Sequence, residues 1–151
     1  MNIRHQTDDQ PTDMMCRRTP LPFRECFLLL GTVVTIRTDS PAILKAAEGA
    51  GLVLQRQSEQ EPGMRWEIVG EQHGTTMVED WECEVTLDTH SLYLGMSAEQ
   101  WFAFDLKTGD GAGFVVVSDN DRLSDLNAEL YLRAIADNIG AYRRLESEER
   151  R

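Results

Sequence analysis

Three polar residues in the second half of the chain, His90, Asp105 and Asp110, are the candidates for a site assembled from dispersed side chains. An imidazole beside carboxylates can transfer protons near neutral pH. All three residues fall at predicted turns or strand ends, where acidic residues are common for structural reasons. The sequence therefore leaves two alternatives open: a small enzyme or small-ligand-binding protein that uses these groups, or surface residues without chemistry.

No motif for a nucleophile, a metal ion or a nucleotide stands out elsewhere in the sequence. A metal site usually includes two ligands that are close in sequence, and the histidines and cysteines are all isolated. They are His5, His73, His90, Cys16, Cys26 and Cys83. The segment G-D-G-A-G at 109–113 lacks the G-K-[ST] of a phosphate loop, and a hairpin turn explains it. We expect no cofactor, and the motifs weigh against an enzyme.

Three tryptophans, Trp66, Trp81 and Trp101, occupy alternating positions in separate predicted strands. Alternation places such side chains on one face of a sheet. That face is either the hydrophobic core or an aromatic patch that contacts a partner, because large aromatic side chains contribute strongly to both. These three residues are therefore the candidate interaction surface.

The composition excludes several classes of protein. The chain has 151 residues and a formal net charge of −11, and 41% of its residues are hydrophobic. This length fits one domain, and this composition argues against both a fully disordered chain and a membrane bundle. A surface this acidic repels phosphate backbones, and no local basic patch stands out in the sequence. We therefore expect no nucleic-acid partner.

We expect a disordered polar leader (1–22), a domain (23–146) and a charged tail (147–151). The three cysteines show neither a disulfide framework nor zinc-site spacing, which favours reduced thiols in a cytoplasmic protein. The apolar run at 26–36 is too short to span a bilayer, so we expect no membrane association. Its length also fits the apolar region of a signal peptide, but its β-branched residues favour a strand, so an exported protein is the weaker alternative.

Apolar and polar residues alternate along several short segments, which predicts β-strands. The strand segments, some of them continuous apolar runs, are 27–36, 52–56, 64–69, 81–87, 91–96, 101–106 and 114–117. The first can form one strand or two, with a bend at Gly31. The alternation in 81–87 predicts a set of side chains on the buried face. These are Trp81, Cys83, Val85 and Leu87.

Two helices are predicted around these strands. Ser40 can cap a short helix of about nine residues that begins at Pro41, because proline fits the first helical position. From Asp121 to about Leu145, apolar residues recur at helical spacing. Hairpin-linked strands form antiparallel sheets, so the predicted class is α+β: a mainly antiparallel sheet with one short helix and one long C-terminal helix packed on it.

Two segments carry a resemblance to a known family. Residues 34–47, V-T-I-R-T-D-S-P-A-I-L-K-A-A, and residues 101–119, W-F-A-F-D-L-K-T-G-D-G-A-G-F-V-V-V-S-D, resemble the amino-terminal region of bacterial HPr-kinase-like proteins. The phosphate loop of that family is absent from this sequence, so no catalytic residue is carried over. The resemblance implies a stand-alone regulatory or scaffolding part. We expect a non-catalytic domain that binds another protein or a second copy of itself.

Overall fold

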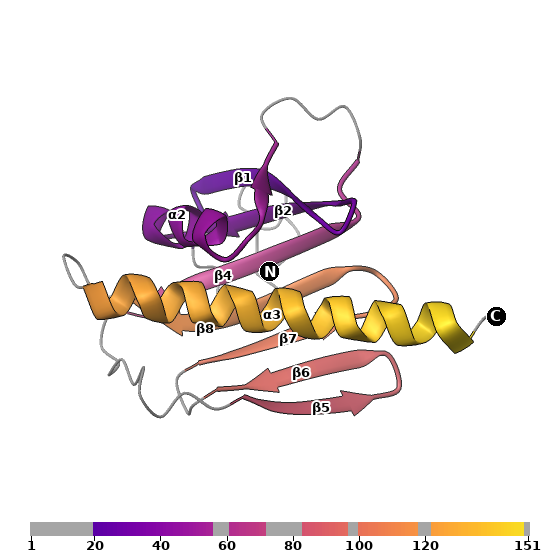
Figure 1. Ribbon diagram of the computed structural model, residues 1–151. Helices are drawn as coiled ribbons and strands as arrows, with labels where there is room; N and C mark the ends of the chain where they lie inside the picture. Colours follow the sequence, from indigo (N-terminus) through magenta and orange to yellow (C-terminus); the bar gives the residue numbers. More distant parts are fainter. Residues whose placement is uncertain (1–19, 56–60, 72–82, 97–99, 118–121, 150–151) are drawn as a thin grey trace, which may run out of the picture.

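The described residues fold into one sheet with two helices against it (Figure 1). The computed structural model describes residues 20–55, 61–71, 83–96, 100–117 and 122–149. The strands are β1 (Phe23–Leu29), β2 (Thr32–Thr38), β3 (Val53–Leu54), β4 (Met64–Glu71), β5 (Glu84–Asp88), β6 (Ser91–Gly95), β7 (Trp101–Asp105) and β8 (Asp110–Val116). The helices are α2 (Pro41–Gly49) and α3 (Arg122–Glu149).

The strand order across the sheet is β3-β1-β2-β4-β8-β7-β6-β5. Most neighbouring strands are antiparallel, whereas the central pairs β2–β4 and β4–β8 are parallel. The connection from β2 to its parallel neighbour β4 contains the short helix α2 and the strand β3. The predicted α+β class, with a mainly antiparallel sheet, a short helix and a long C-terminal helix, is confirmed.

The hairpin of β1 and β2 turns at Leu30 and Gly31, which have φ angles of 51° and 80°. Two consecutive residues with positive φ form the tight turn whose twist matches that of the flanking strands. Gly31 adopts this backbone without the steric cost that a side chain brings. The apolar run that could have formed one strand or two therefore forms two.

The short helix α2 begins at Pro41, as the sequence predicts, and Gly51, with φ of 98°, follows its end. The predicted side-chain cap is wrong. The Ser40 hydroxyl makes no capping hydrogen bond, and the Ser40 carbonyl instead accepts the Ile43 N–H at 3.1 Å. The Thr38 hydroxyl accepts the Ser40 N–H at 3.2 Å, so a hydrogen bond joins the residue before the helix to the last residue of β2.

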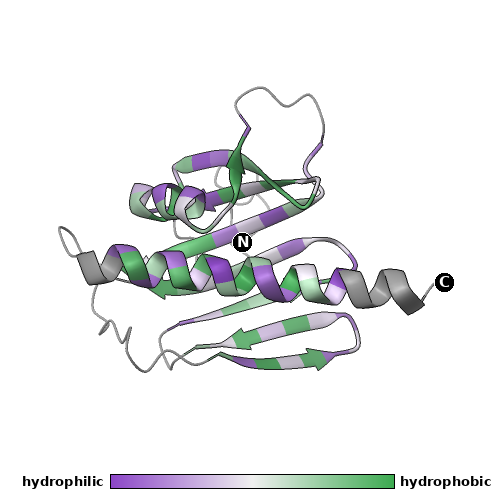
Figure 2. Ribbon diagram, viewed as in Figure 1, coloured by the Kyte–Doolittle hydropathy of each residue, from purple (hydrophilic) through white to green (hydrophobic). Residues whose placement is uncertain are grey.

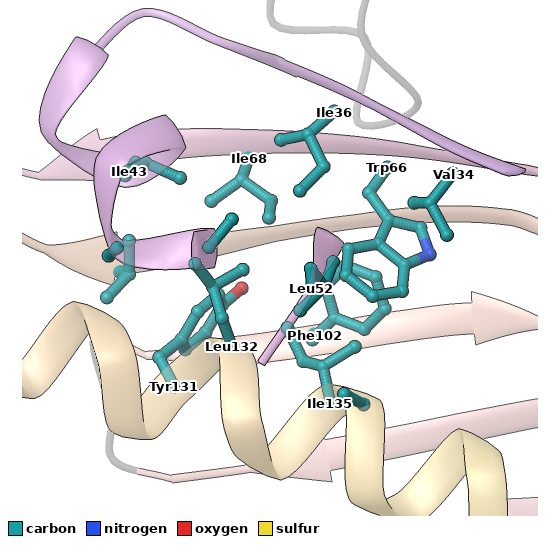
Figure 3. Close-up of a cluster of buried hydrophobic side chains, with 14 of the residues drawn as sticks. Val34, Ile36, Ile43, Leu52, Trp66, Ile68, Phe102, Tyr131, Leu132 and Ile135 are labelled. Carbon is teal, nitrogen blue, oxygen red and sulfur yellow. The ribbon is translucent and has the colours of Figure 1, made fainter. Parts of the chain in front are cut away.

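The sheet face under the helices, here called the helix face, forms the main hydrophobic core. Alternation places every second residue of a strand on this face, and Figure 2 shows the resulting alternation of hydrophobic and hydrophilic residues. Fully buried members of the core, most of them drawn in Figure 3, are Val34, Ile36, Ile43, Met64, Trp66, Ile68, Phe102, Tyr131, Leu132 and Ile135. Met64, Trp66 and Ile68 alternate along the predicted strand 64–69, and all three are buried in this core.

Gly113 allows α3 to approach the sheet closely. A Cβ atom at this position would lie 2.3 Å from the Tyr131 hydroxyl and 2.2 Å from the Trp101 carbonyl oxygen. Tyr131 is fully buried, and its hydroxyl donates a hydrogen bond of 2.8 Å to the same carbonyl. Burial raises the pKa of Tyr131 well above its usual value. The glycine-rich segment therefore serves packing as well as the hairpin turn.

A buried amide pair joins α3 to the sheet near the start of the helix. Gln100 and Asn127 are 4% and 0% exposed, and their side-chain amides hydrogen-bond to each other. The Gln100 side-chain oxygen accepts the Val116 N–H at 2.9 Å, and the Asn127 amide donates to the Val116 carbonyl at 3.1 Å. Because buried polar groups are costly unless paired, this arrangement favours one position of the helix on the sheet.

Several predicted boundaries are corrected by the structure. The helix α3 continues through Gly140 to Glu149, into the segment predicted as a charged tail. The strand β8 begins at Asp110, so Gly111 and Gly113 belong to a strand and not to the turn. The residues of the predicted leader before Pro20 lie outside the described part. Leu21 is 5% exposed and packs against the domain.

We predict that Gly113→Ala destabilises the protein by about 2 kcal/mol, because the added methyl group overpacks the contact between α3 and the sheet. Gly95→Ala is the matched control, since a Cβ there meets only the Tyr93 ring, at 3.7 Å. Denaturant unfolding followed by tryptophan fluorescence measures both. Equal losses for the two variants would contradict the close approach at Gly113.

We predict that Asn127→Leu costs about 2 kcal/mol, because it leaves Gln100 and the Val116 carbonyl buried without their partner. The double variant Asn127→Leu and Gln100→Leu should lose less than the sum of the two single losses, since residues that share a network are not additive. Free energies of unfolding for the four proteins test this. Strict additivity would show that the two amides act independently.

Candidate functional site

The opposite face of the sheet, here called the open face, is not covered by α2 or α3 (Figure 1). A small apolar cluster of Leu21, Val69 and Phe114 lies on it, with Trp101 packed beside them. The Trp101 ring stacks on Tyr93 with ring centroids 5.9 Å apart and meets Phe114 edge-on at 5.3 Å. Of these aromatic side chains, Tyr93 is 44% exposed and Trp101 is half-buried, so a partner can reach both, whereas Phe114 is buried.

The three predicted tryptophans do not form one surface. Trp66 is fully buried on the helix face, where it packs edge-on against Phe102 at 5.6 Å, so its assignment to an interaction surface is wrong. Trp81 lies outside the described residues. Trp101 is half-buried on the open face beside Tyr93, which is 44% exposed. Of the three tryptophans of the predicted interaction surface, Trp101 is the one that the structure shows accessible to a partner.

His90, Asp105 and Asp110 are brought to the same end of the sheet by the β5–β6 and β7–β8 turns. The Asp105 carboxylate accepts the N–H groups of Lys107 and Thr108 at 2.8 and 3.2 Å. These two bonds, with smaller contributions from the nearby charges of His90 and Lys107, lower the pKa of Asp105. A lowered pKa suits a carboxylate that holds a turn in its ionised form.

The other two members of this group also have local partners. The Asp110 carboxylate pairs with Arg65 at 3.4 Å, and the carbonyl of His90 accepts the N–H of Leu106 at 2.7 Å. None of the three residues lines the cleft around Arg24, Arg37 and Arg65 that is described below. Within the described ranges, no group of three or more His, Cys, Asp or Glu side chains could hold a metal ion.

The strand β5 is a fully exposed edge of the sheet. All five of its residues are exposed, and Val85 and Leu87 are 49% and 51% exposed. The prediction that these two side chains are buried is wrong, and Cys83 is only half-buried, although burial still raises its pKa. Val85 and Leu87 are exposed because α3 lies over β8 and β7 and does not extend over β5 (Figure 1).

Three arginines gather in a cleft of about 470 Å³ on the open face. Arg24 comes from β1, Arg37 from β2 and Arg65 from β4. The sequence showed no local basic patch, because these residues are dispersed along the chain and meet only through strand pairing. The register of β1 and β2 puts Arg24 opposite Arg37, and nothing in the sequence alone indicates that register.

Comparisons with known proteins identify no relative. No protein-family model matches the chain, and neither a curated protein nor a solved structure matches it. The resemblance to HPr-kinase-like proteins therefore stays a prediction, as does the cytoplasmic location. Neither α2 nor α3 is long and apolar enough to cross a membrane, and no other helix lies in the described residues.

We predict that Asp105→Ala lowers the melting temperature at neutral pH more than Asp105→Asn does, because asparagine keeps an oxygen that can accept the turn N–H groups. The pKa of Asp105 is lowered by folding, so its stabilising effect is present above its unfolded pKa and is lost as the pH falls through the folded value. Melting curves as a function of pH should therefore converge for native protein and Asp105→Ala in acid. A constant difference at every pH would contradict this role.

Proposed function

We propose that this protein is a non-catalytic protein-interaction domain that binds an extended segment of another protein along β5. The observation that supports the proposal is the exposure of all five residues of this edge strand. The outer edge of a sheet presents unpaired backbone N–H and C=O groups that an added strand can bind. At the other edge, β3 has only two residues, which is too short to guide such binding.

The side chains of β5 define the chemistry of the partner. Val85 and Leu87 pair with the buried Leu94 and Leu92, so they project on the helix face, where they expose apolar surface. Glu84 and Asp88 alternate with them and therefore project on the open face. A bound strand that matches both faces alternates apolar residues with lysine or arginine.

A second copy of this chain fits the same edge less well. Antiparallel pairing of two β5 strands centred on Thr86 places Glu84 opposite Asp88 of the second copy, and like charges directly opposite are destabilising. Each copy also carries a net charge of −11, which opposes close association. Charge complementarity therefore favours a basic segment of a different protein.

We predict that a fluorescent peptide of alternating lysine and valine binds the protein, and that a glutamate–valine peptide does not. In the Glu84→Lys/Asp88→Lys variant, affinity for the lysine–valine peptide should fall about tenfold, since two favourable charge pairs become unfavourable. The glutamate–valine peptide should bind this variant instead. Fluorescence anisotropy at fixed salt concentration measures all four combinations.

A matched control carries the same change of charge away from the edge. Glu48→Lys/Asp137→Lys alters two exposed residues on α2 and α3, and its peptide preference should stay native. If the control loses binding as strongly as the β5 variant, net charge alone explains the result and the edge is not the site. A stable dimer in light scattering that Val85→Lys dissociates would assign the edge to a second copy.

A further inference from the structure

We infer that the arginine cleft on the open face binds the phosphate or carboxylate group of a small molecule. The site consists of Arg24, Arg37 and Arg65, together with the surfaces that enclose them. It lies on β1, β2 and β4, and in the strand order these are separated from β5 by β8, β7 and β6. The inference is therefore independent of the function proposed for the edge strand.

The pairing register concentrates positive charge in this cleft. Arg24 and Arg37 are direct partners in the antiparallel pair of β1 and β2. Side chains of direct partners lie on the same face, so two guanidinium groups are neighbours, and like charges in this arrangement are destabilising. Arg65 on β4 is the partner of Thr35, which is two residues before Arg37 on β2. Arg65 therefore lies diagonally across from Arg37 on the same face. An anion between these groups removes the repulsion.

The carboxylates of the protein compensate this charge only in part. Glu67 lies 3.7 Å from Arg37 and also lines the cleft, and Asp110 lies 3.4 Å from Arg65 but is not a lining residue. Arg24 forms no ion pair with any residue in the described ranges. The lining therefore contains three guanidinium groups and one carboxylate, although the chain as a whole has a net charge of −11.

The remaining walls of the cleft favour a compact ligand. Leu21, Pro22 and Pro62 provide apolar surface, and Thr35, which is 4% exposed, also lines the cleft. The volume of about 470 Å³ falls in the range of small-molecule sites. Apolar walls reduce the screening of charges by water and so strengthen the attraction to an anion.

Arginine is the residue best suited to such a ligand. Its planar guanidinium donates paired hydrogen bonds to the oxygens of a phosphate or carboxylate. Three arginines on adjacent strands can contact several oxygens of one group. A long polyanion fits poorly, because the acidic remainder of the surface repels it. The chemistry therefore points to a single multivalent oxyanion on a small molecule.

The test measures binding of inorganic phosphate and of citrate to the full chain by NMR titration and calorimetry, with sodium chloride holding the ionic strength constant. We expect saturable binding of at least one probe, with shifts confined to β1, β2 and β4. Phosphate alone would identify a phosphate-bearing ligand, and citrate alone a carboxylate-bearing one. Absence of saturable binding by both would overturn the inference.

The variant Arg24→Gln should weaken binding about tenfold, because a charge-assisted pair of hydrogen bonds is lost. Arg133→Gln is the matched control: Arg133 lies on α3 and donates to the Gly49 carbonyl on the other side of the sheet. Its affinity for the probe should stay native.

A second measurement separates binding from folding. Without an anion, Arg24→Gln should melt no lower than the native protein, because it removes repulsion from Arg37. The added probe should raise the melting temperature of the native protein more than that of the variant. Equal affinity and equal stabilisation in the two proteins would overturn the site.

Discussion

The packing of α3 against the centre of the sheet is the constraint on which the rest of the structure depends. Tyr131 reaches the sheet because Gly113 has no side chain, and its hydroxyl hydrogen-bonds to the Trp101 carbonyl. The buried pair of Gln100 and Asn127 satisfies polar groups at the same contact. Close approach and paired polar groups together fix where the helix lies, because a shifted helix would lose both. The helix face becomes the core as a consequence.

One-sided coverage by the helices explains where the accessible surfaces are. The helices cover the helix face but leave β5 beyond their reach, so Val85 and Leu87 remain exposed. The open face carries polar residues, and strand pairing brings several residues of like charge together. Arginines gather on β1, β2 and β4, whereas Glu84 and Asp88 lie on the edge strand. The sheet therefore offers a basic cleft and an acidic edge, which suit ligands of opposite charge.

Acidic residues at strand and helix ends, among them the candidates Asp105 and Asp110, make bonds that hold the fold. Asp105 accepts two N–H groups of its own turn, and Asp110 pairs with Arg65 on the neighbouring strand. Asp39 accepts the Gly70 N–H at 2.8 Å and thereby joins the start of α2 to β4. Such bonds satisfy backbone groups where strands and helices end, and they account for the acidic residues at these positions.

The sequence by itself determined the local elements, because alternation, helical spacing and turn residues act on neighbouring residues of the chain. It predicted the α+β class, the short helix at Pro41 and the strands on either side of the glycine-rich segment. The tertiary structure decided which strands are neighbours, and therefore that Arg24 meets Arg37 and that Trp66 is core. It also decided that β5 lies uncovered, although its alternation indicated a buried face. Register and coverage depend on contacts between residues far apart in sequence, and these leave no local periodic signal.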